Sequence, residues 1–396
     1  MFKVPEYEIN ERIAKLQHLL QQKGIDAMFI VQHADLFYFS GTAQNGYLYV
    51  PAEKEPLLFI RKYMPRAEKE SSIRQIIEIR SVKDIPGLIL KHLGKIADII
   101  GFELDVMPVN EFYFFRNLLG CGKCRDGAGL IHSIRMIKSL WEIEQIKHTA
   151  EISHKVFDYI EKELRPGISE MEFSGIYETH ARKLGHAARL KIRNYNSELC
   201  NWHILSGTSG GAVGMLDSPA TGYGTSPANP CGGSNKLLNR NEPIMIDMST
   251  NVNGYHMDET RMFAMGSMPE KAENACRAVI DIHNSIIEKA LPGSRVDTLY
   301  TKAVNMAEDM GYQDQFLGPK GYKVTFIGHG LGLEIVEPPF IAKGKKDRLK
   351  PGMVFALEPK MVFEHLFSAG IESVFMVTET GGRLLSGVPV DIFIKH

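Results

Sequence analysis

A chain of 396 residues is long for one domain and predicts two. Its hydrophobic fraction of 44% is ordinary for a globular protein with a substantial core. A formal net charge of -1 gives no support for a broad nucleic-acid-binding surface or for an electrostatic attraction to membranes.

The first third of the chain alternates helical and strand patterns. Asn10 is expected to cap a helix that ends at Gly24. Apolar runs then predict strands at residues 25–31, 47–50, 56–60 and 99–102, with a further helix over residues 110–119. This alternation predicts an α/β layer, which we assign to an amino-terminal domain of residues 1–134.

Residues 135–396 are predicted to form a second domain of the α+β class. Ser139 and Glu142 have the spacing of a capping box that opens a helix, and Ser169 and Glu172 repeat it. A third helix is expected around residues 278–286, after a predicted hairpin. Residues 207–234, which are rich in glycine, serine and proline, are a candidate substrate lid.

The predicted hairpin carries two acids. Residues 243–248 and 255–263 are expected to pair as strands around the turn Asn253-Gly254, which is the strongest short hairpin signal. Asp247 and Asp258 would then face each other across the hairpin. Two later strand-like segments carry Glu358 and Glu372, and glycines surround the remaining polar candidate, His329; these five residues are Asp247, Asp258, His329, Glu358 and Glu372.

Four carboxylates and one imidazole form a ligand set suited to divalent manganese, cobalt, iron or zinc. Taken singly, each acid would be interpreted as a solvated or capping residue. Three of them, Asp247, Glu358 and Glu372, lie inside strongly apolar runs, where an ionised carboxylate is costly unless it is paired or coordinated. Two ions sharing bridging carboxylates would hold a hydroxide and polarise a carbonyl, which is the outline of a hydrolase site.

Four ordered motifs give the chain a resemblance to a known family. They are Ile246-Asp-Met with Gly254-Tyr-His-Met-Asp-Glu-Thr-Arg261, Gly328-His-Gly-Leu-Gly-Leu-Glu-Ile-Val-Glu-Pro-Pro339, Lys350-Pro-Gly-Met-Val-Phe-Ala-Leu-Glu-Pro359, and Gly370-Ile-Glu372. Over nearly its whole length the chain resembles the pita-bread metallopeptidases, which include prolidase, aminopeptidase P, methionine aminopeptidase and the metal-free creatinase.

The resemblance implies a creatinase/prolidase-like amino-terminal domain and a pita-bread catalytic domain with two divalent ions. Asp247 and Asp258 would bind one metal side, His329 and Glu358 the other, with Asp258 and Glu372 shared. Glu358 would also be the proton shuttle for the bridging water. The implied activity is that of a Xaa-Pro dipeptidase or aminopeptidase, and the implied assembly is a homodimer.

Two departures from the family pattern concern substrate contacts. A second histidine usually follows the first by seven residues, where this chain has Val336, an apolar wall for the substrate. A histidine is also usual about seventeen residues before the first ligand Asp, and residues 228–236 contain none. Losing a preorganised donor costs ~3–4 kcal/mol of transition-state stabilisation. His203, His256 and His365 are candidate replacements, His203 as a catalytic residue and His365 as a substrate-binding one.

Three classes of function therefore stay open. The first is a metal-dependent peptidase acting on an amino-terminal or Xaa-Pro bond, with a peptide or other small molecule as its substrate. The second is a metalloenzyme of the same fold that acts on a small non-peptide acid or amide, and the third is a catalytically silent binding protein. The complete ligand set argues against the third class and against creatinase-like, metal-free chemistry.

The remaining signals concern location. The charged start, residues 1–8, lacks the apolar core of a signal peptide, and no segment approaches the length of a membrane span. Five scattered cysteines fit a reducing cytoplasm, and the isolated pair Cys121 and Cys124 is interpreted as incidental thiols. We therefore expect a cytoplasmic protein without nucleic-acid or membrane partners.

Overall fold

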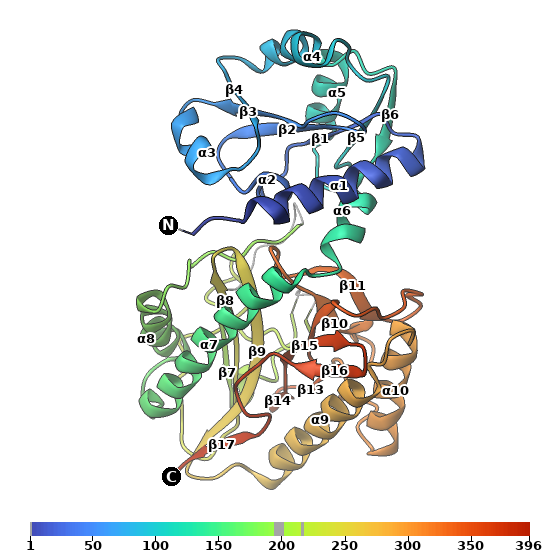
Figure 1. The fold of residues 1–396 in the computed structure, drawn as a ribbon. Coiled ribbons are helices and arrows are strands. Elements are labelled where there is room, and N and C mark those ends of the chain that lie inside the picture. Colours follow the sequence, from blue (N-terminus) through green and yellow to red (C-terminus); the bar gives the residue numbers. More distant parts are fainter. Residues whose placement is uncertain (1, 194–201, 215–217) are drawn as a thin grey trace. The chain divides into compact units, whose positions relative to one another are not determined.

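The structure, a computed structural model, describes residues 2–193, 202–214 and 218–396. The chain divides into two compact units. The first consists of Met1–Arg135 together with Arg193–Tyr195, and the second of Met136–Ile192 and Asn196–His396. Figure 1 shows both units with their elements labelled.

The first unit is built on a six-stranded sheet with the strand order β4-β3-β2-β1-β5-β6. Strand β2 is antiparallel to β1 and β3, and the other pairs are parallel. The strands are β1 Ala27–Ile30, β2 Gly46–Pro51, β3 Leu57–Arg61, β4 Gln75–Ile79, β5 Ile99–Phe102 and β6 Lys123–Asp126. The helices are α1 Glu6–Lys23, α2 His33–Ser40, α3 Met64–Glu70, α4 Ile85–Leu93, α5 Val109–Leu118 and α6 Ala128–Arg135, with a short 3-10 turn η1 at Val82–Asp84.

Helix α1 begins earlier than its sequence predicts. Asn10 lies inside the helix, and Pro5 occupies the cap position with φ -59 and ψ 145. The proline fixes its own φ near the helical value, and the acids Glu6 and Glu8 in the first turn favour the positive end of the helix dipole. The predicted end is confirmed, since Gly24 caps the helix in the left-handed region with φ 61.

Within its described residues, the second unit contains two sheets, a separate hairpin and four helices. The strand orders are β11-β10-β12-β15-β16 and β17-β9-β8-β7, and the hairpin is β13-β14. The strands are β7 Trp202–Ser206, β8 Ile244–Val252, β9 Tyr255–Met265, β10 Phe326–Gly330, β11 Glu337–Ala342, β12 Val354–Leu357, β13 Lys360–Phe363, β14 Phe367–Gly370, β15 Ser373–Thr378, β16 Gly381–Leu384 and β17 Ile392–Lys395. The helices are α7 Leu140–Glu163, α8 Glu170–Lys183, α9 Glu270–Lys289 and α10 Val296–Asp309, with a 3-10 turn η2 at Gly207–Ser209.

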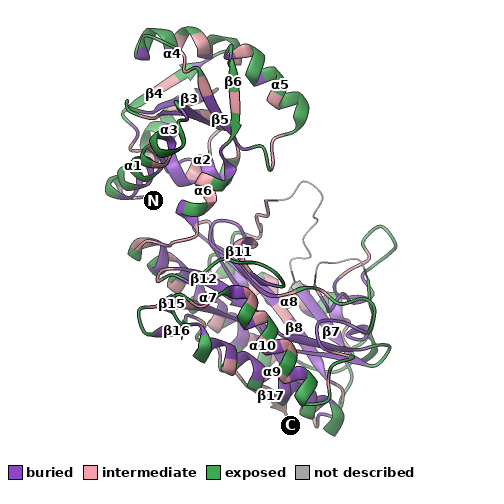
Figure 2. Cartoon of the chain, turned by 90° about the vertical axis from the view of Figure 1, so that its right-hand side faces the viewer, coloured by how far each residue is buried: buried purple, intermediate pink, exposed green. Residues whose placement is uncertain are grey.

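The helices of the second unit cover its sheets. Helix α7 packs on β8 and β9, whereas α9 packs on α10, β14 and β16. Ser139 and Glu142 form the predicted capping box of α7, and the Ser169 side chain caps α8. The strands are largely buried, and the helices alternate buried and exposed positions (Figure 2). None of the helices in the described ranges combines the length and apolarity that crossing a bilayer requires.

The candidate lid is closely attached to the second unit in its described part. The buried carboxylate of Glu170 accepts hydrogen bonds from the Ser206 and Ser234 hydroxyls at 2.9 and 2.8 Å, and from the Ser209 hydroxyl at 3.1 Å. A buried acid with several donors holds its loops in one arrangement. Residues 215–217 of this segment lie outside the described residues.

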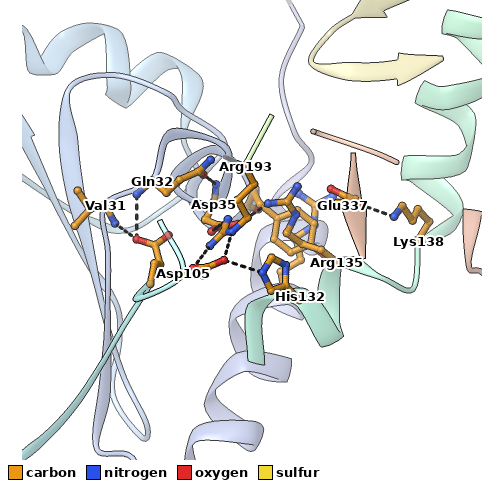
Figure 3. A network of polar contacts seen from close by, with 12 residues as sticks. Val31, Gln32, Asp35, Asp105, His132, Arg135, Lys138, Arg193 and Glu337 are labelled. Atoms are coloured by element: carbon orange, nitrogen blue, oxygen red, sulfur yellow. Dashed lines mark hydrogen bonds and ion pairs between the residues drawn. The ribbon is translucent and has the colours of Figure 1, made fainter. Parts of the chain in front are cut away.

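A buried ionic network organises the first unit (Figure 3). Asp35 is fully buried, and its two carboxylate oxygens accept from Arg135 Nη1 at 2.7 Å and Arg193 Nη1 at 2.5 Å. Arg193 also donates to Asp105 at 2.6 Å. Burial alone would raise the pKa of Asp35, but the two guanidinium groups hold the pKa below its usual value.

We predict that Asp35→Ala will destabilise the first unit by ~3–5 kcal/mol, because it removes the carboxylate that two buried guanidinium groups contact. Native-state hydrogen exchange of the amides in β1 and β5 measures this loss within the unit. Glu11→Ala is the control, because it removes an exposed ion pair with Lys15 that contributes ~1 kcal/mol or less. Equal effects of the two substitutions would contradict the prediction.

Candidate metal centre

The hairpin β8–β9 delivers the first two acids. Its turn is Asn253-Gly254, with positive φ angles of 55 and 91, as the sequence signal requires. Asp247 is paired with Thr260, and Asp258 with Ser249. The two acids are therefore diagonal neighbours on one face of the hairpin. The prediction that they face each other directly across the hairpin was wrong.

His329 reaches the same region through a close approach of backbones. It lies on β10 and is paired with Ala356 on β12, two residues before Glu358. A side chain at Gly328 would meet the Ala356 carbonyl oxygen at 2.5 Å, and one at Gly330 would meet the Pro338 carbonyl oxygen at 2.6 Å. Only glycine on either side of His329 leaves room for the neighbouring strands.

Asp258, His329 and Glu372 converge into one buried group. One ligand atom from each lies within 4.8 Å of the others. Glu372 arrives just before β15 and is held by backbone bonds to Thr260 on β9. His329 Nε2 lies 3.9 Å from Asp258 Oδ2 and 3.5 Å from Glu358 Oε1.

The surroundings of this group orient it for a metal ion. Ser249 Oγ donates to Asp258 Oδ1 at 2.7 Å, and Thr260 Oγ1 donates to Glu372 Oε2 at 2.9 Å. His329 Nδ1 donates to the Gly330 carbonyl at 3.1 Å, which leaves Nε2 with its lone pair free for a ligand. Glu372 Oε1 is buried with no hydrogen-bond partner among the described residues. The residues present therefore fit one divalent ion.

A lysine, Lys360, lies among the acids on the Asp247 and Glu358 side of the five-residue set. Its ammonium nitrogen lies 2.9 Å from Asp247 Oδ2, 2.7 Å from Glu358 Oε2 and 3.2 Å from Glu372 Oε2. The residue is only 1% exposed. Sequence reasoning missed Lys360, whose one signal is a charge at the start of the apolar run Lys360-Met-Val-Phe363. The residues around it hold an ammonium group where a second ion was expected.

The pKa shifts of Asp258 and Glu372 differ from those of Asp247 and Lys360. Burial, and then the neighbouring Asp247, raise the pKa of Asp258 well above its usual value. Burial and Asp258 do the same to the pKa of Glu372. Burial opposes ionisation of Asp247 and Lys360 too, but their mutual attraction lowers the pKa of Asp247 and raises that of Lys360. Lys360 therefore compensates the charge of Asp247 more fully than the charges of Asp258 and Glu372.

The other predicted site residues lie in different settings. His203 on β7 is paired with Asp247, is buried, and has no hydrogen-bond partner for Nδ1 among the described residues. Val336 is partly buried in the turn before β11. His365 lies in the β13–β14 turn with 86% of its side chain exposed, and its ion-pair partner is Glu364.

His256 is occupied structurally. Its Nδ1 donates to the Gly332 carbonyl at 2.9 Å, and its Nε2 accepts from the Lys191 backbone N–H and the Asn251 amide. Burial lowers the pKa of His256 to about 4, which keeps the ring neutral. It has no nitrogen left for a substrate.

Comparison with known proteins decides the family. Residues 144–379 match the model of metallopeptidase family M24, and residues 12–137 match the creatinase/prolidase N-terminal domain. The chain belongs to metallopeptidase family M24. Membership confirms the predicted resemblance, the fold class of both domains and the prediction of a metallopeptidase-type hydrolase.

Similar proteins span nearly the full length of the chain. A Xaa-Pro dipeptidase of Pyrococcus furiosus is 27% identical over 382 residues, covering 96% of this chain and 98% of that protein. An uncharacterized peptidase of Bacillus subtilis, YqhT, is 24% identical and covers 97% of this chain and 99% of the relative. The solved prolidase of Pyrococcus horikoshii superposes with a TM-score of 0.81 at 22% identity, covering 96% of this chain and 99% of that one.

We predict that Asp258→Asn will weaken Mn²⁺ binding by at least ~10–100-fold, because the amide keeps the size of the side chain but loses its charge. Isothermal titration calorimetry and elemental analysis after dialysis measure the loss. Asp281→Asn, which changes an exposed acid on α9, should bind Mn²⁺ like the unmodified chain. Full metal occupancy in Asp258→Asn would show that this residue is not a ligand.

Proposed function

We propose that the chain hydrolyses the amino-terminal or Xaa-Pro amide bond of a small peptide with a divalent ion held by Asp258, His329 and Glu372. The observation that carries the proposal is the buried three-residue group with an unpartnered Glu372 oxygen. Manganese, cobalt, iron and zinc all suit this mixture of carboxylates and one imidazole. When bound, such an ion activates a water molecule and polarises the scissile carbonyl.

Glu358 is the proposed general base and acid. Its Oε1 faces His329 Nε2 at 3.5 Å, and its Oε2 accepts from Lys360 at 2.7 Å. The carboxylate therefore has one oxygen anchored and the other directed at the proposed reaction centre. In this arrangement Glu358 takes the proton of the attacking water and passes it to the leaving amine.

His203 is the proposed donor to the substrate. The supporting observation is that its Nδ1 is buried beside Asp247 without a hydrogen-bond partner among the described residues. Burial lowers the pKa of His203, which favours the neutral ring. At most it replaces one of the two imidazoles that this chain lacks relative to the family pattern, since Val336 offers no donor.

The second candidate function is hydrolysis of a small non-peptide acid or amide on the same scaffold. Val336 and Lys360 favour it, because an apolar wall and a fixed ammonium group give the site a different shape and charge distribution from those of the predicted peptidase site. A binding protein without catalysis is disfavoured, since a buried ligand group with repelling carboxylates has no structural benefit.

One substrate panel separates the two functions. Xaa-Pro dipeptides, proline-free dipeptides and N-acyl amino acids are incubated with the Mn²⁺-loaded protein, and amine release is measured. Cleavage restricted to peptides with a free amino terminus supports the peptidase, and cleavage of acylated acids alone supports the second function. Metal binding without release from any member would contradict both.

We predict that Glu358→Gln will keep the bound ion and lose ~10²–10⁴-fold in turnover, because an amide cannot carry a proton at neutral pH. Turnover at saturating substrate and metal content are measured on the same preparation. Glu364→Gln, in the exposed turn next to His365, is the matched control. Near-normal turnover of Glu358→Gln would leave this residue with a structural role alone.

The lack of an imidazole at position 336 predicts slow cleavage of ordinary Xaa-Pro dipeptides, below ~1 per second. Val336→His should raise kcat/KM for these substrates by up to ~10²-fold, because it restores a donor to the substrate carbonyl. Steady-state kinetics of the two proteins give the ratio. An unchanged kcat/KM in Val336→His would contradict the prediction, since another group, such as His203, would then already supply that donor.

We further infer a cytoplasmic homodimer. The dimer rests on the family resemblance, and sedimentation velocity tests it. The free thiols of Cys121, Cys124 and Cys276 support a cytoplasmic location, because disulfides are rare in that compartment. Cys231 is disulfide-bonded, which argues against a cytoplasmic location.

A further inference from the structure

Lys360 makes the same contacts that a metal ion would make. Its three carboxylate partners, Asp247, Glu358 and Glu372, come from β8, from the end of β12 and from the segment before β15. An ammonium group has three protons to donate, and three carboxylate oxygens lie at 2.7–3.2 Å. The group is thus fully used by its acidic partners.

We propose that the Lys360 ammonium group takes the place of one of the two ions that the five-residue set was expected to bind, so that this chain binds a single divalent ion. The single ion is the one held by Asp258, His329 and Glu372, so this part of the inference rests on the proposed function.

Space supports the inference. A divalent ion on Asp247, Glu358 and Glu372 would lie ~2.0–2.2 Å from their oxygens. The ammonium nitrogen lies among these same oxygens, and two cations cannot share the position because they exclude and repel each other. A second ion would have to expel the lysine first.

The lysine is built into the fold and cannot leave easily. Lys360 is paired with Gly370 across the β13–β14 hairpin. A Cβ atom at position 370 would lie 2.9 Å from Lys360 Cγ and 3.6 Å from Cδ, so the glycine provides the space through which the lysine stem runs. The side chain is 2% exposed. Expelling its charge from this interior would cost the three acids their counter-charge.

The charge balance agrees with one ion. Asp247, Asp258, Glu358 and Glu372 carry four negative charges when ionised, and His329 is neutral when it binds a metal. One ammonium group and one divalent ion supply three positive charges, which leaves a single negative charge for a cationic substrate group. Two divalent ions together with Lys360 would instead overcompensate the carboxylates.

Metal stoichiometry tests the inference without any assay of activity. The full-length protein is saturated with Mn²⁺, freed of excess metal, and examined by elemental analysis and by electron paramagnetic resonance. The unmodified chain should retain one ion with the signal of an isolated Mn²⁺. Lys360→Ala, which removes both the charge and the volume, should retain two ions with the signal of an exchange-coupled pair.

Two further variants separate space and charge from general damage. Lys360→Met keeps most of the volume without the charge and should stay at one ion. Lys138→Ala removes another buried lysine of the same unit, paired with Glu337 at 2.7 Å, and should also stay at one ion. If Lys360→Ala does not fold, the stoichiometry of the unmodified chain decides alone.

The outcomes distinguish this inference from the proposed function. Two ions and a coupled signal in the unmodified chain would overturn the inference and leave the hydrolase proposal intact. One ion in both the unmodified chain and a folded Lys360→Ala would overturn the role of Lys360. One ion in the unmodified chain without hydrolysis of any panel substrate would overturn the proposed function and leave the inference standing.

Discussion

The mutual repulsion of four converging carboxylates is the constraint on which the second unit depends. Asp247 and Asp258 lie on β8 and β9, whereas Glu358 follows β12 and Glu372 precedes β15. All four carboxylates are mostly shielded from water, where like charges interact strongly. The β8–β9 hairpin and the glycines beside His329 bring them together. The four carboxylates can stay this close together only if positively charged groups lie among them.

Lys360 supplies part of that positive charge, and the proposed divalent ion would supply the rest. The Lys360 side bears a covalently attached cation with three hydrogen bonds, and Asp247 and Lys360 stabilise each other's charged forms. The Asp258 side has raised carboxyl pKa values, a histidine with an accepting nitrogen and an orphaned Glu372 oxygen. Glu358 contacts both sides, with Oε1 3.5 Å from His329 Nε2 and Oε2 2.7 Å from Lys360 Nζ, so in the proposed role as proton carrier it would lie between the fixed charge and the bound ion.

Much of this could be predicted from the sequence, because local chemistry decides it. The capping box at Ser139, the Asn253-Gly254 turn and the order of the acids all depend on neighbouring residues. The two-residue turn also fixes the strand register, because Val252 must pair with Tyr255 and Asp247 therefore with Thr260. The expectation that Asp247 and Asp258 stand directly opposite each other was wrong although the sequence contained this register. The burial of Lys360 was not predicted, because a lysine is ordinarily exposed to solvent. Its pairing with Gly370 and the three acids around its ammonium group bury it, and both are set by tertiary structure.

The attachment of Lys360 to the backbone has a consequence for life in a cell with fluctuating trace metals. A free ion can be withdrawn by a chelator or exchanged for a tighter-binding but unsuitable competitor, since affinities follow a fixed order among the first-row metals. The ammonium group can be neither withdrawn nor exchanged. In the proposed single-ion centre, the half that contains Lys360 would therefore be unaffected by metal exchange or metal shortage, and only the half with Asp258 would depend on the metal supply.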